Sequence, residues 1–562
     1  MKLGKRTTLA LLSAVTVLNL ILRYPQFPHE VGVDSFFVHT LSVAIASDGY
    51  ARWILNPFSY FGWYPMSYPS AGPFLLSSTS VVGNVDVETS IFVVCMLLGP
   101  VGILSSFMMA REFRESDLFA LGAAALYGLA PRFLAFTLWS ASTRSLFMSL
   151  LPIFMWLLIA NYRKRSRVAN LLLLAVIVAL LAATHRLVVL LAIVFLAFLL
   201  AIITLLLVRI LRIRFPHVVL RESFRRVTPY VVLGSVAMTA GTMILGTNVL
   251  QEYTYGELAS GDSPLIQLAN LSVSIARSGG LAVPLLFFGL VGIVRQRNKT
   301  VAEPFLAFAT LGLIPTLLLR QYTGFYILPL LALLGGFGFE RLILQFGKRR
   351  KQALAVGVGL CLGISGLSIY VLSVEIDRTT VLTSETYDTG LYIRSLRVSG
   401  TIVANEGLLG IRVGAISGAH MLPVGGAGTT FQSPELLAFG FYTPDEVNNA
   451  ITRISLQELT LESDSLWSAS GIQAEFDWVL VLQSQHGNIP AQLALRYDPV
   501  YLLELKEAPG RFLAYGNVYC ADLGLWAHDS QYVVYDNGYE ALWWLRASGS
   551  PPSSRAGPRT CA

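Results

Sequence analysis

The sequence has 562 residues, 54% of them hydrophobic and 13% charged, with a mean hydropathy of +0.60 and a net charge of +7. A soluble globular protein carries about a quarter charged residues, so this composition excludes that class and predicts a polytopic membrane protein. The charge is unevenly spread, because residues 1–374 hold 30 Lys and Arg against 14 Asp and Glu, whereas residues 375–562 hold 11 against 20. The positive-inside rule explains the basic part better than a nucleic-acid partner, which we do not expect.

Apolar runs of membrane-spanning length predict about eleven transmembrane helices. The first run follows a basic start and has no small-x-small cleavage site after it, so we expect an uncleaved first helix rather than a removed signal peptide. The expected helices cover residues 7–23, 88–109, 118–137, 144–162, 168–184, 187–208, 230–249, 281–294, 301–319, 323–344 and 353–374.

The loops between these runs give the orientation. With the N-terminus in the cytoplasm, every cluster of Lys and Arg falls on the cytoplasmic side, including residues 163–167, 209–229, 295–299 and 348–351. That agreement is the pattern of the positive-inside rule. It predicts a multi-pass protein of the cell membrane with residues 24–87, 250–280 and 375–562 outside.

The first outer segment, residues 24–87, is long, aromatic and rich in Pro and Gly. Long ordered loops often carry function. Asp34 comes shortly after the first apolar run, which places its carboxylate at the membrane surface. Asp34 is therefore the candidate catalytic residue, either as a general base or as a ligand of a divalent cation such as Mg²⁺ or Mn²⁺. His39 is a weaker candidate metal ligand, and the structural alternative for Asp34 is a solvated loop carboxylate or helix cap.

Four cationic or titratable side chains lie at the outer ends of predicted helices. Arg144 begins one helix, His185 and Arg186 lie in an outer hairpin, and Arg320 ends another helix. Arg suits phosphate because its planar fork can bind oxygens in pairs. An Arg at a helix end also commonly extends to lipid headgroups, so both readings stay open.

Residues 375–546 change in character, since short β-type runs alternate with Gly turns and with helical candidates such as residues 385–396. The runs 400–406, 476–483, 511–519 and 531–545 predict strands, and Asn537-Gly538 predicts a tight turn or hairpin. Together they predict an extracytoplasmic α/β domain after a transmembrane domain of residues 1–374. Residues 547–562 have the composition of a disordered tail. Cys520 and Cys561 are both expected outside, where a disulfide between them is allowed.

At this point a resemblance can be named. A basic N-terminus, one helix, a long outer loop with an early Asp, many helices and an outer C-terminal domain resemble the GT-C class of membrane glycosyltransferases. Within it, Asp34-Ser35-Phe36-Phe37-Val38-His39 is similar to the acidic-aromatic motif of oligosaccharyltransferase catalytic subunits and their prokaryotic relatives. The resemblance implies a GT-C-like fold, an outer active site with Asp34, and a mobile outer loop at residues 250–280, which contains Glu252 and Glu257.

The resemblance also implies a reaction. A sugar or oligosaccharide carried on a polyprenyl phosphate or diphosphate passes to a glycan, lipid or protein acceptor at the outer leaflet, with inversion at the anomeric carbon. Arg144, His185, Arg186 and Arg320 would then contact the donor phosphate, and membrane lipids surround the enzyme.

Two departures from the family affect the acceptor. The next outer loop, residues 139–144, carries no Asp-x-Asp motif, and Trp543-Trp544 is followed by Leu-Arg rather than by Asp. These departures favour a relative that acts on an acceptor other than a peptide. Two other classes remain as alternatives, a polytopic membrane transporter and a non-catalytic scaffold with an outer interaction domain. The predicted helices show few central charges and no evident repeat, which argues against the transporter.

The orientation can be tested by cysteine labelling in intact cells, with the native cysteines replaced. A membrane-impermeant thiol reagent should label single cysteines at Tyr60, Leu265 and Leu480, and should not label cysteines at Arg165, Leu220 or Arg350. The basic clusters alternate together, so labelling at Arg165 from outside would overturn the whole placement.

Overall fold

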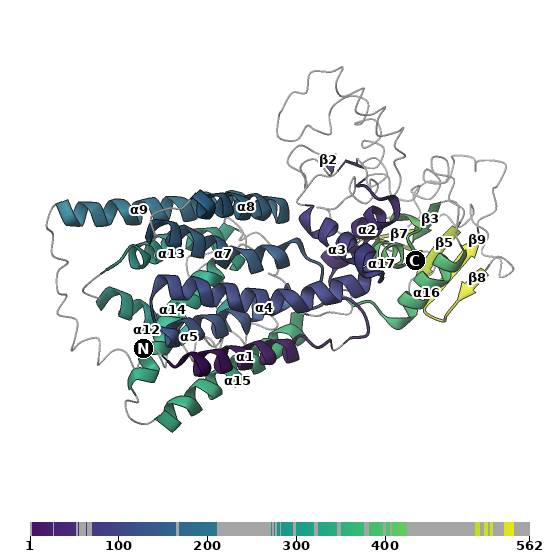
Figure 1. Ribbon diagram of the computed structural model, residues 1–562. Coiled ribbons are helices and arrows are strands. Elements are labelled where there is room, and N and C mark those ends of the chain that lie inside the picture. The colour runs from purple at the N-terminus through teal and green to yellow at the C-terminus, as the bar shows by residue number, and fades with distance from the viewer. Residues whose placement is uncertain are drawn as a thin grey trace, which may run out of the picture. The chain divides into compact units, whose positions relative to one another are not determined.

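The computed structural model divides into two compact units, which are described separately (Figure 1). Unit 1 consists of Met1–Pro25 and Val93–Asp377, and unit 2 consists of Gln26–Phe92 and Arg378–Ala562. The residues that the structure describes are 3–25, 27–51, 54–55, 63–64, 70–163, 168–210, 271, 275, 278–280, 283–295, 299–319, 324–345, 350–375, 381–396, 401–404, 407–423, 501–505, 511–514, 517–520 and 533–544.

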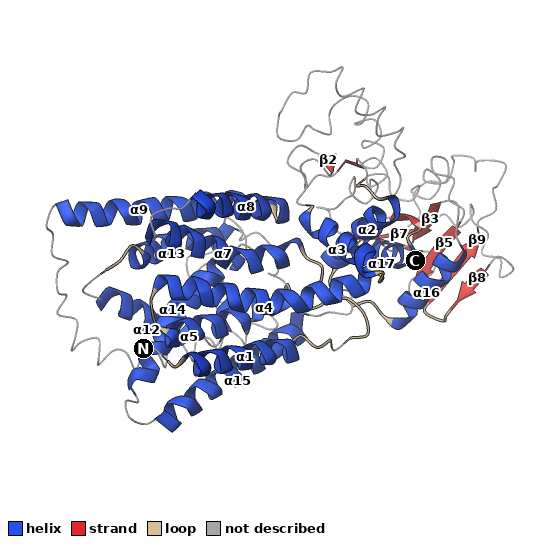
Figure 2. Ribbon diagram, viewed as in Figure 1, coloured by secondary structure: helices blue, strands red, loops and turns tan. Residues whose placement is uncertain are grey.

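Unit 1 is built from apolar helices that run side by side (Figures 1 and 2). Their bounds are α1 Lys5–Leu22, α4 Val87–Phe113 (which begins in unit 2), α5 Asp117–Gly128, α6 Pro131–Ala135, α7 Thr143–Arg163, α8 Val168–Thr184, η1 Arg186–Leu190, α9 Leu191–Ile210, α12 Val283–Arg295, α13 Ala302–Leu319, α14 Gly324–Gln345 and α15 Arg350–Glu375. Five of the described helices are long and apolar enough to cross a membrane, and α5, α8, α13 and α15 contain shorter apolar stretches. These helices support a multi-pass membrane protein, while the total of about eleven spans stays a prediction.

Most of the helices expected from hydropathy are present within a few residues. One prediction was wrong: residues 118–137 do not form one helix, because α5 ends at Gly128 and the short α6 begins at Pro131. Proline has no amide hydrogen and clashes with the preceding turn, so it starts a helix readily but interrupts one. The expected helix at 230–249 lies outside the described residues.

Helix α14 packs closely between α12 and α5, and glycines permit the approach. A side chain at Gly289 of α12 would collide with the backbone of Leu334, and one at Gly338 of α14 would collide with the backbone of Leu285. On its other face, Gly336 lies against the backbone of α5. Small residues at helix contacts are typical of membrane proteins, because van der Waals packing rather than the hydrophobic effect drives association in lipid.

A buried arginine and its neighbour Asn19 tie α1 to two other helices and to the segment after α6. Arg23 is 1% exposed and follows α1 directly. Its guanidinium donates to the Asn19 side chain at 2.8 Å, to the Cys95 carbonyl at 3.3 Å and to the Thr137 carbonyl and hydroxyl at 2.5 Å. Asn19 in turn donates to the Gly128 carbonyl at 2.6 Å. The network therefore joins the end of α1 to α4, to α5 and to the segment after α6.

The opposite end of these helices is joined by carboxylates. Glu340 of α14 is 1% exposed, accepts from the Ser116 hydroxyl and pairs with Arg114 at 3.3 Å. Asp117 accepts from the Leu3 amide at 2.9 Å. Both carboxylates lie at the connection between α4 and α5, so this connection is fixed to α14 and to the start of the chain.

Unit 2 combines helices from the first outer segment with strands from the end of the chain (Figure 2). Its elements are α2 Val33–Asp48, β1 Ile54–Leu55, β2 Trp63–Tyr64, α3 Ala71–Gly83, α16 Ser384–Leu396, β3 Thr401–Ala404, α17 Gly407–Ser417, β4 His420–Pro423, β5 Tyr501–Leu505, β6 Arg511–Ala514, β7 Asn517–Cys520, β8 Val533–Asp536 and β9 Glu540–Trp544. The first outer segment, expected as a loop, thus contains two helices, α2 and α3.

Five strands of unit 2 form one mixed sheet in the order β4-β3-β5-β9-β8. Strand β3 pairs in parallel with both β4 and β5, whereas β9 pairs antiparallel with β5 and β8. Helix α17 forms the connection between the parallel strands β3 and β4, which is the usual arrangement for such a pair. The expected turn at Asn537-Gly538 is confirmed, since it joins β8 to β9 and Gly538 has a φ of +88°.

The remaining expectations for unit 2 had mixed outcomes. The helix expected at residues 385–396 and the strand at 400–406 are confirmed as α16 and β3. The run 511–519 was expected as one strand but forms the antiparallel pair β6 and β7. Helix α17 and strands β4 and β5 were not expected. The expected strand at 476–483 and the cysteine Cys561 lie outside the described residues.

The Arg23 network predicts an unusual sensitivity to one methyl group. A side chain at Gly99 of α4 would overlap the Asn19 and Arg23 side chains, whereas Gly359 of α15 has no atom within 4 Å of that position. Gly99→Ala should lower the free energy of unfolding by about 1–3 kcal/mol through overpacking. Gly359→Ala should be neutral or slightly stabilising, since Ala favours helix over Gly. Thermal melting of the detergent-solubilised variants measures both, and equal melting temperatures would contradict the close packing.

Candidate active site

Asp34 lies in the first turn of α2, and its side chain is half-buried. The helix starts after Gly32, whose φ of +100° is readily adopted only by glycine. The Gly32 carbonyl accepts from the Ser35 amide at 2.9 Å and so closes the first turn. A carboxylate at this position is stabilised by the positive end of the helix dipole. The candidate base is therefore an ionisable group on a helix rather than on a loop.

The two phenylalanines that follow Asp34 anchor its helix. Phe36 is 1% exposed and Phe37 is 8% exposed, and they form a buried cluster with Leu382 and with residues of α17. The Arg412 guanidinium of α17 lies 5.7 Å from the centre of the Phe36 ring. An antiparallel bridge between Val31 and Val381 adds a backbone contact just before α2. The acidic-aromatic motif thus has a structural part, because its aromatic residues bury against the C-terminal segment.

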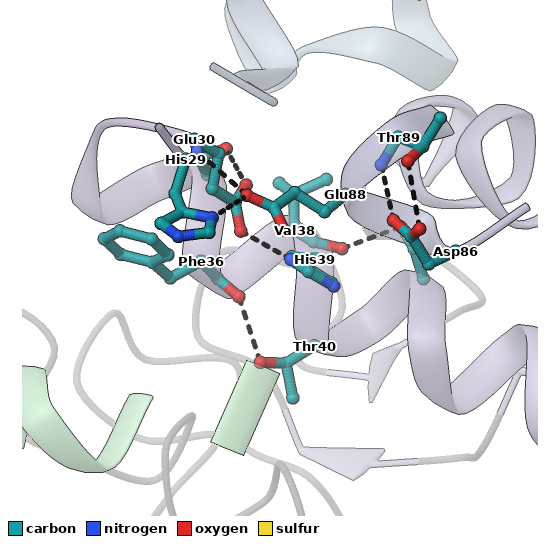
Figure 3. A network of polar contacts seen from close by, with 11 residues as sticks. His29, Glu30, Phe36, Val38, His39, Thr40, Asp86, Glu88 and Thr89 are labelled. Carbon is teal, nitrogen blue, oxygen red and sulfur yellow. Dashed lines mark hydrogen bonds and ion pairs between the residues drawn. The ribbon is translucent and has the colours of Figure 1, made fainter. Parts of the chain in front are cut away.

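A set of hydrogen bonds closes around Glu30 (Figure 3). The Glu30 side chain is 0% exposed. One of its oxygens accepts from the Ser35 hydroxyl at 2.5 Å, and the other lies 2.5 Å from Nδ1 of His39. The Glu30 amide donates to Glu88 at 3.2 Å. Glu30 therefore connects the segment before α2 with the first two turns of α2 and with the start of α4.

The Glu88 carboxylate also contacts the segment before α2 through His29. Its Oε1 lies 3.0 Å from His29 Nδ1, and the His29 ring stacks on Tyr387 of α16 with centroids 3.8 Å apart. Partial burial and the nearby Glu88 and Asp86 carboxylates raise the pKa of Tyr387 above its usual value. The segment from His29 to Asp34 is therefore held by contacts to both α4 and α16.

A second buried carboxylate of unit 2 is Glu540, at the start of β9. It is 0% exposed and accepts from the Thr386 hydroxyl at 2.5 Å. Asn537, three residues earlier, accepts from the Glu540 amide at 2.7 Å and donates to Thr389 of α16 at 3.0 Å. Burial raises the pKa of Glu540, although the hydrogen bonds from Thr386 and Thr389 oppose the shift. These contacts fix the turn between β8 and β9 onto α16.

Two of the expected phosphate-binding residues are described, both in unit 1. Arg144 is the second residue of α7, and its guanidinium lies 5.1 Å from the centre of the Phe136 ring. His185 is 6% exposed and makes edge contacts with the rings of Phe147 and Phe325, whose centroids lie 6.0 Å and 5.3 Å away. Since Phe147 lies one turn after Arg144, the structure brings both residues to the start of α7.

The side chains of the other expected site residues lie outside the described part of the structure. Arg186 begins η1, but its side chain lies outside the described part. Arg320, Glu252 and Glu257 are also outside it. Their roles stay predictions.

The described residues do not form a metal site around Asp34. Nowhere in the described part of the chain are three His, Cys, Asp or Glu side chains grouped so that they could hold an ion. His39, the second expected ligand, has its Nδ1 engaged by Glu30.

The fold corresponds to that of known membrane glycosyltransferases. The first structure is the Archaeoglobus fulgidus oligosaccharyltransferase tethered to an acceptor peptide with the NVT sequon, with a TM-score of 0.51 at 14% identity over 74% of this chain and 64% of that one. The second is AglB of the same organism with an inhibitory peptide and a dolichol-phosphate, with a TM-score of 0.50 at 13% identity over 90% and 70%. The third is apo ArnT from Cupriavidus metallidurans, with a TM-score of 0.51 at 14% identity over 95% and 97%.

The family comparison agrees with the fold. The model of the family described as oligosaccharyl transferase STT3, N-terminal, matches residues 8–251, a range that includes Asp34 and the Glu30 contacts within α2. No curated protein matches the chain. The predicted resemblance to GT-C membrane glycosyltransferases, and among them to oligosaccharyltransferase catalytic subunits, is confirmed. The chain spans 64% of the tethered archaeal enzyme, and identities of 13–14% establish the fold alone.

The contacts around Glu30 have little signal in the amino-acid sequence. Glu30 and His39 are nine positions apart, on either side of the Gly32 turn, and follow neither the helical nor the strand period. Glu88 lies at the start of an apolar run and carries no motif. The one usable signal is a cluster of titratable residues near Asp34, since such clusters occur often at functional sites.

The raised pKa of Glu540 predicts a pH-dependent stability. Above the ordinary value of 4.5, the folded state keeps a proton that the unfolded state has lost, so stability falls as pH rises towards the folded pKa. The slope approaches about 1.4 kcal/mol per pH unit within that window. Glu540→Gln should remove this slope, and Asp388→Asn, which changes an exposed carboxylate of α16, should keep it. Melting temperatures between about pH 5 and pH 8 provide the measurement. Parallel curves for wild type and Glu540→Gln would contradict the prediction.

Proposed function

We propose that this protein transfers a sugar or oligosaccharide from a polyprenyl-phosphate-linked donor to an acceptor at the outer face of the membrane. The observation that carries the proposal is Asp34, a half-buried carboxylate on the anchored first turn of α2 within the region that matches the oligosaccharyltransferase family. Two structural neighbours support the substrate classes, because one is tethered to an acceptor peptide and the other is in complex with a dolichol-phosphate. The comparisons support neither the transporter nor the scaffold alternative.

In the proposed reaction, Asp34 acts as the general base. An acceptor hydroxyl or amide attacks the anomeric carbon of the donor sugar, and its proton passes to the Asp34 carboxylate. The bond between the anomeric carbon and the phosphate oxygen breaks, so that polyprenyl phosphate or diphosphate leaves and the configuration inverts. A positioned base of this kind typically contributes a factor of about 10²–10⁴ to the rate.

The leaving phosphate needs cations, and we assign this role to the start of α7 and the outer hairpin. Arg144 is the second residue of α7, the His185 ring lies 6.0 Å from the ring of Phe147 in the same helix, and Arg186 follows His185 directly. Arg320 is assigned the same role from its place in the sequence. In this proposal the N-terminus is cytoplasmic, and residues 24–87, 250–280 and 375–546 lie outside. The loop at 250–280, with Glu252 and Glu257, covers the bound substrates.

The acceptor class follows from the departures in the sequence. The loop at 139–144 has no carboxylate, and the sequence after Trp543-Trp544 lacks the Asp of the family's peptide-binding motif. We therefore favour a glycan or lipid acceptor over a peptide. The chemistry at Asp34 is the same for each acceptor class, since each presents a nucleophile that must lose a proton.

Asp34→Asn tests the base directly. The substitution keeps the size of the side chain but removes the charge, so the protein should remain folded while transfer falls about a hundredfold or more. Asp48→Asn, the same change at the other end of α2, should leave transfer unchanged. The assay follows loss of label from lipid-linked sugars extracted from a deletion strain grown on radiolabelled glucose, with membranes of that strain as acceptor.

Two results would oppose the proposal. Transfer by Asp34→Asn at the wild-type rate would remove Asp34 from the chemistry, and failure of the wild-type protein to release label would remove the activity itself. A chelator distinguishes the two roles of Asp34. A base predicts no effect, whereas loss of wild-type transfer with chelator and its rescue by Mg²⁺ or Mn²⁺ would assign Asp34 to a metal.

A further inference from the structure

The contacts around Glu30 are not used by the proposed reaction, yet they enclose the turn that carries Asp34. Glu30 and Ser35 are 0% exposed and His39 is 2% exposed, so all three are withdrawn from solvent while Asp34 is only half-buried. Ser35 is the residue next to Asp34. A substrate that reaches Asp34 therefore has no need to reach Glu30 or His39. Any effect of these two residues on the reaction would be indirect, through the position of Asp34.

The geometry of these contacts fixes the start of α2. Ser35 and His39 are four residues apart, so they lie on the same face of the helix. One carboxylate, Glu30, bonds both of them at 2.5 Å and thus holds two successive turns against the segment before the helix. The Glu30 amide is itself held by Glu88 at 3.2 Å. Figure 3 shows that Glu30 and His39 point toward one another across the turn.

These contacts are polar although burying a carboxylate costs free energy, which suggests that they serve a purpose other than stability. A buried carboxylate must be satisfied by hydrogen bonds, and an apolar group of similar size is often at least as stable. When Glu30 is ionised, Nδ1 of His39 must carry the proton, which fixes the ring tautomer. Directional hydrogen bonds of this kind hold a single geometry more strictly than apolar packing does.

We propose that Glu30 and His39 are positioning residues, which hold the first turn of α2 so that the Asp34 carboxylate stands in place for proton abstraction. The proposal rests on the proposed function of Asp34. It predicts that loss of either contact slows the chemical step rather than donor binding. A displacement of about 1 Å in a reacting group can cost up to about a hundredfold in rate.

Three variants of His39 test whether a hydrogen-bond donor to Glu30 is needed at the position of Nδ1. Asn places a donor near the position of Nδ1, whereas Gln places it near Nε2 and Ala provides none. We expect the maximal transfer rate to fall about 10–100-fold in His39→Ala and His39→Gln, and less than about fivefold in His39→Asn. The half-saturating amount of extracted donor should change less than about twofold in all three. Ser42→Ala is the matched control, because among the described residues its buried hydroxyl bonds only the Val38 carbonyl of the same helix, at 2.8 Å.

A second measurement separates positioning from general stability. In the Asp34→Asn background, His39→Ala should cause no further loss of residual transfer, because a residue that acts through Asp34 has nothing left to position. Glu30→Gln, which keeps the shape of the side chain, should lower the maximal rate at an unchanged melting temperature. It keeps the test available if His39→Ala does not fold.

Several outcomes would overturn the proposal. Wild-type rates in folded His39→Gln and Glu30→Gln would show that the contacts are irrelevant to transfer. An equal loss from His39→Ala with and without Asp34 would show that it does not act through Asp34. If Asp34→Asn is itself fully active, the proposed function fails instead, which is a separate result.

Discussion

The buried Glu30 carboxylate is the constraint on which the start of α2, and with it Asp34, depends. Removing a carboxylate from water is costly, and here the cost is offset by the Ser35 hydroxyl and the His39 ring. Both partners belong to α2, so satisfying Glu30 also sets where α2 begins. The positive φ of Gly32 lets the chain turn between Glu30 and the helix. Asp34 stands within this turn, so its position follows from the need to satisfy its buried neighbour.

Residues far apart in the sequence complete the same arrangement. Phe36 and Phe37 bury against α17, and His29 stacks on Tyr387 of α16. These contacts join the first outer segment to the C-terminal part of the chain within one compact unit. The C-terminal segment therefore provides the surface on which the helix of Asp34 packs. Substitutions that disrupt α16 or α17 would therefore also displace Asp34.

Hydropathy predicted the membrane helices because a segment that crosses the hydrocarbon core must be apolar along its length. The helix predicted at 7–23 is found at Lys5–Leu22. The break before Pro131 was not predicted, because the sequence stays apolar across it. Helix α2 was missed for the opposite reason, since its polar residues Ser35, His39 and Ser42 are buried by specific partners rather than by lipid. The turn at Asn537-Gly538 was predictable because its signal is local. Asp34 could be selected from the sequence, but Glu30 and Glu88 could not, because their partners are set by tertiary structure.

The most direct measurement of the central claim is the mass of the cell-surface glycans in a strain whose chromosomal copy carries Asp34→Asn. If Asp34 is catalytic, these glycans should lack a sugar or oligosaccharide, match those of a complete deletion and be restored by a wild-type copy but not by more of the variant. Surface glycans identical to those of the parent strain, in cells that contain the variant protein at normal levels in the membrane, would contradict it.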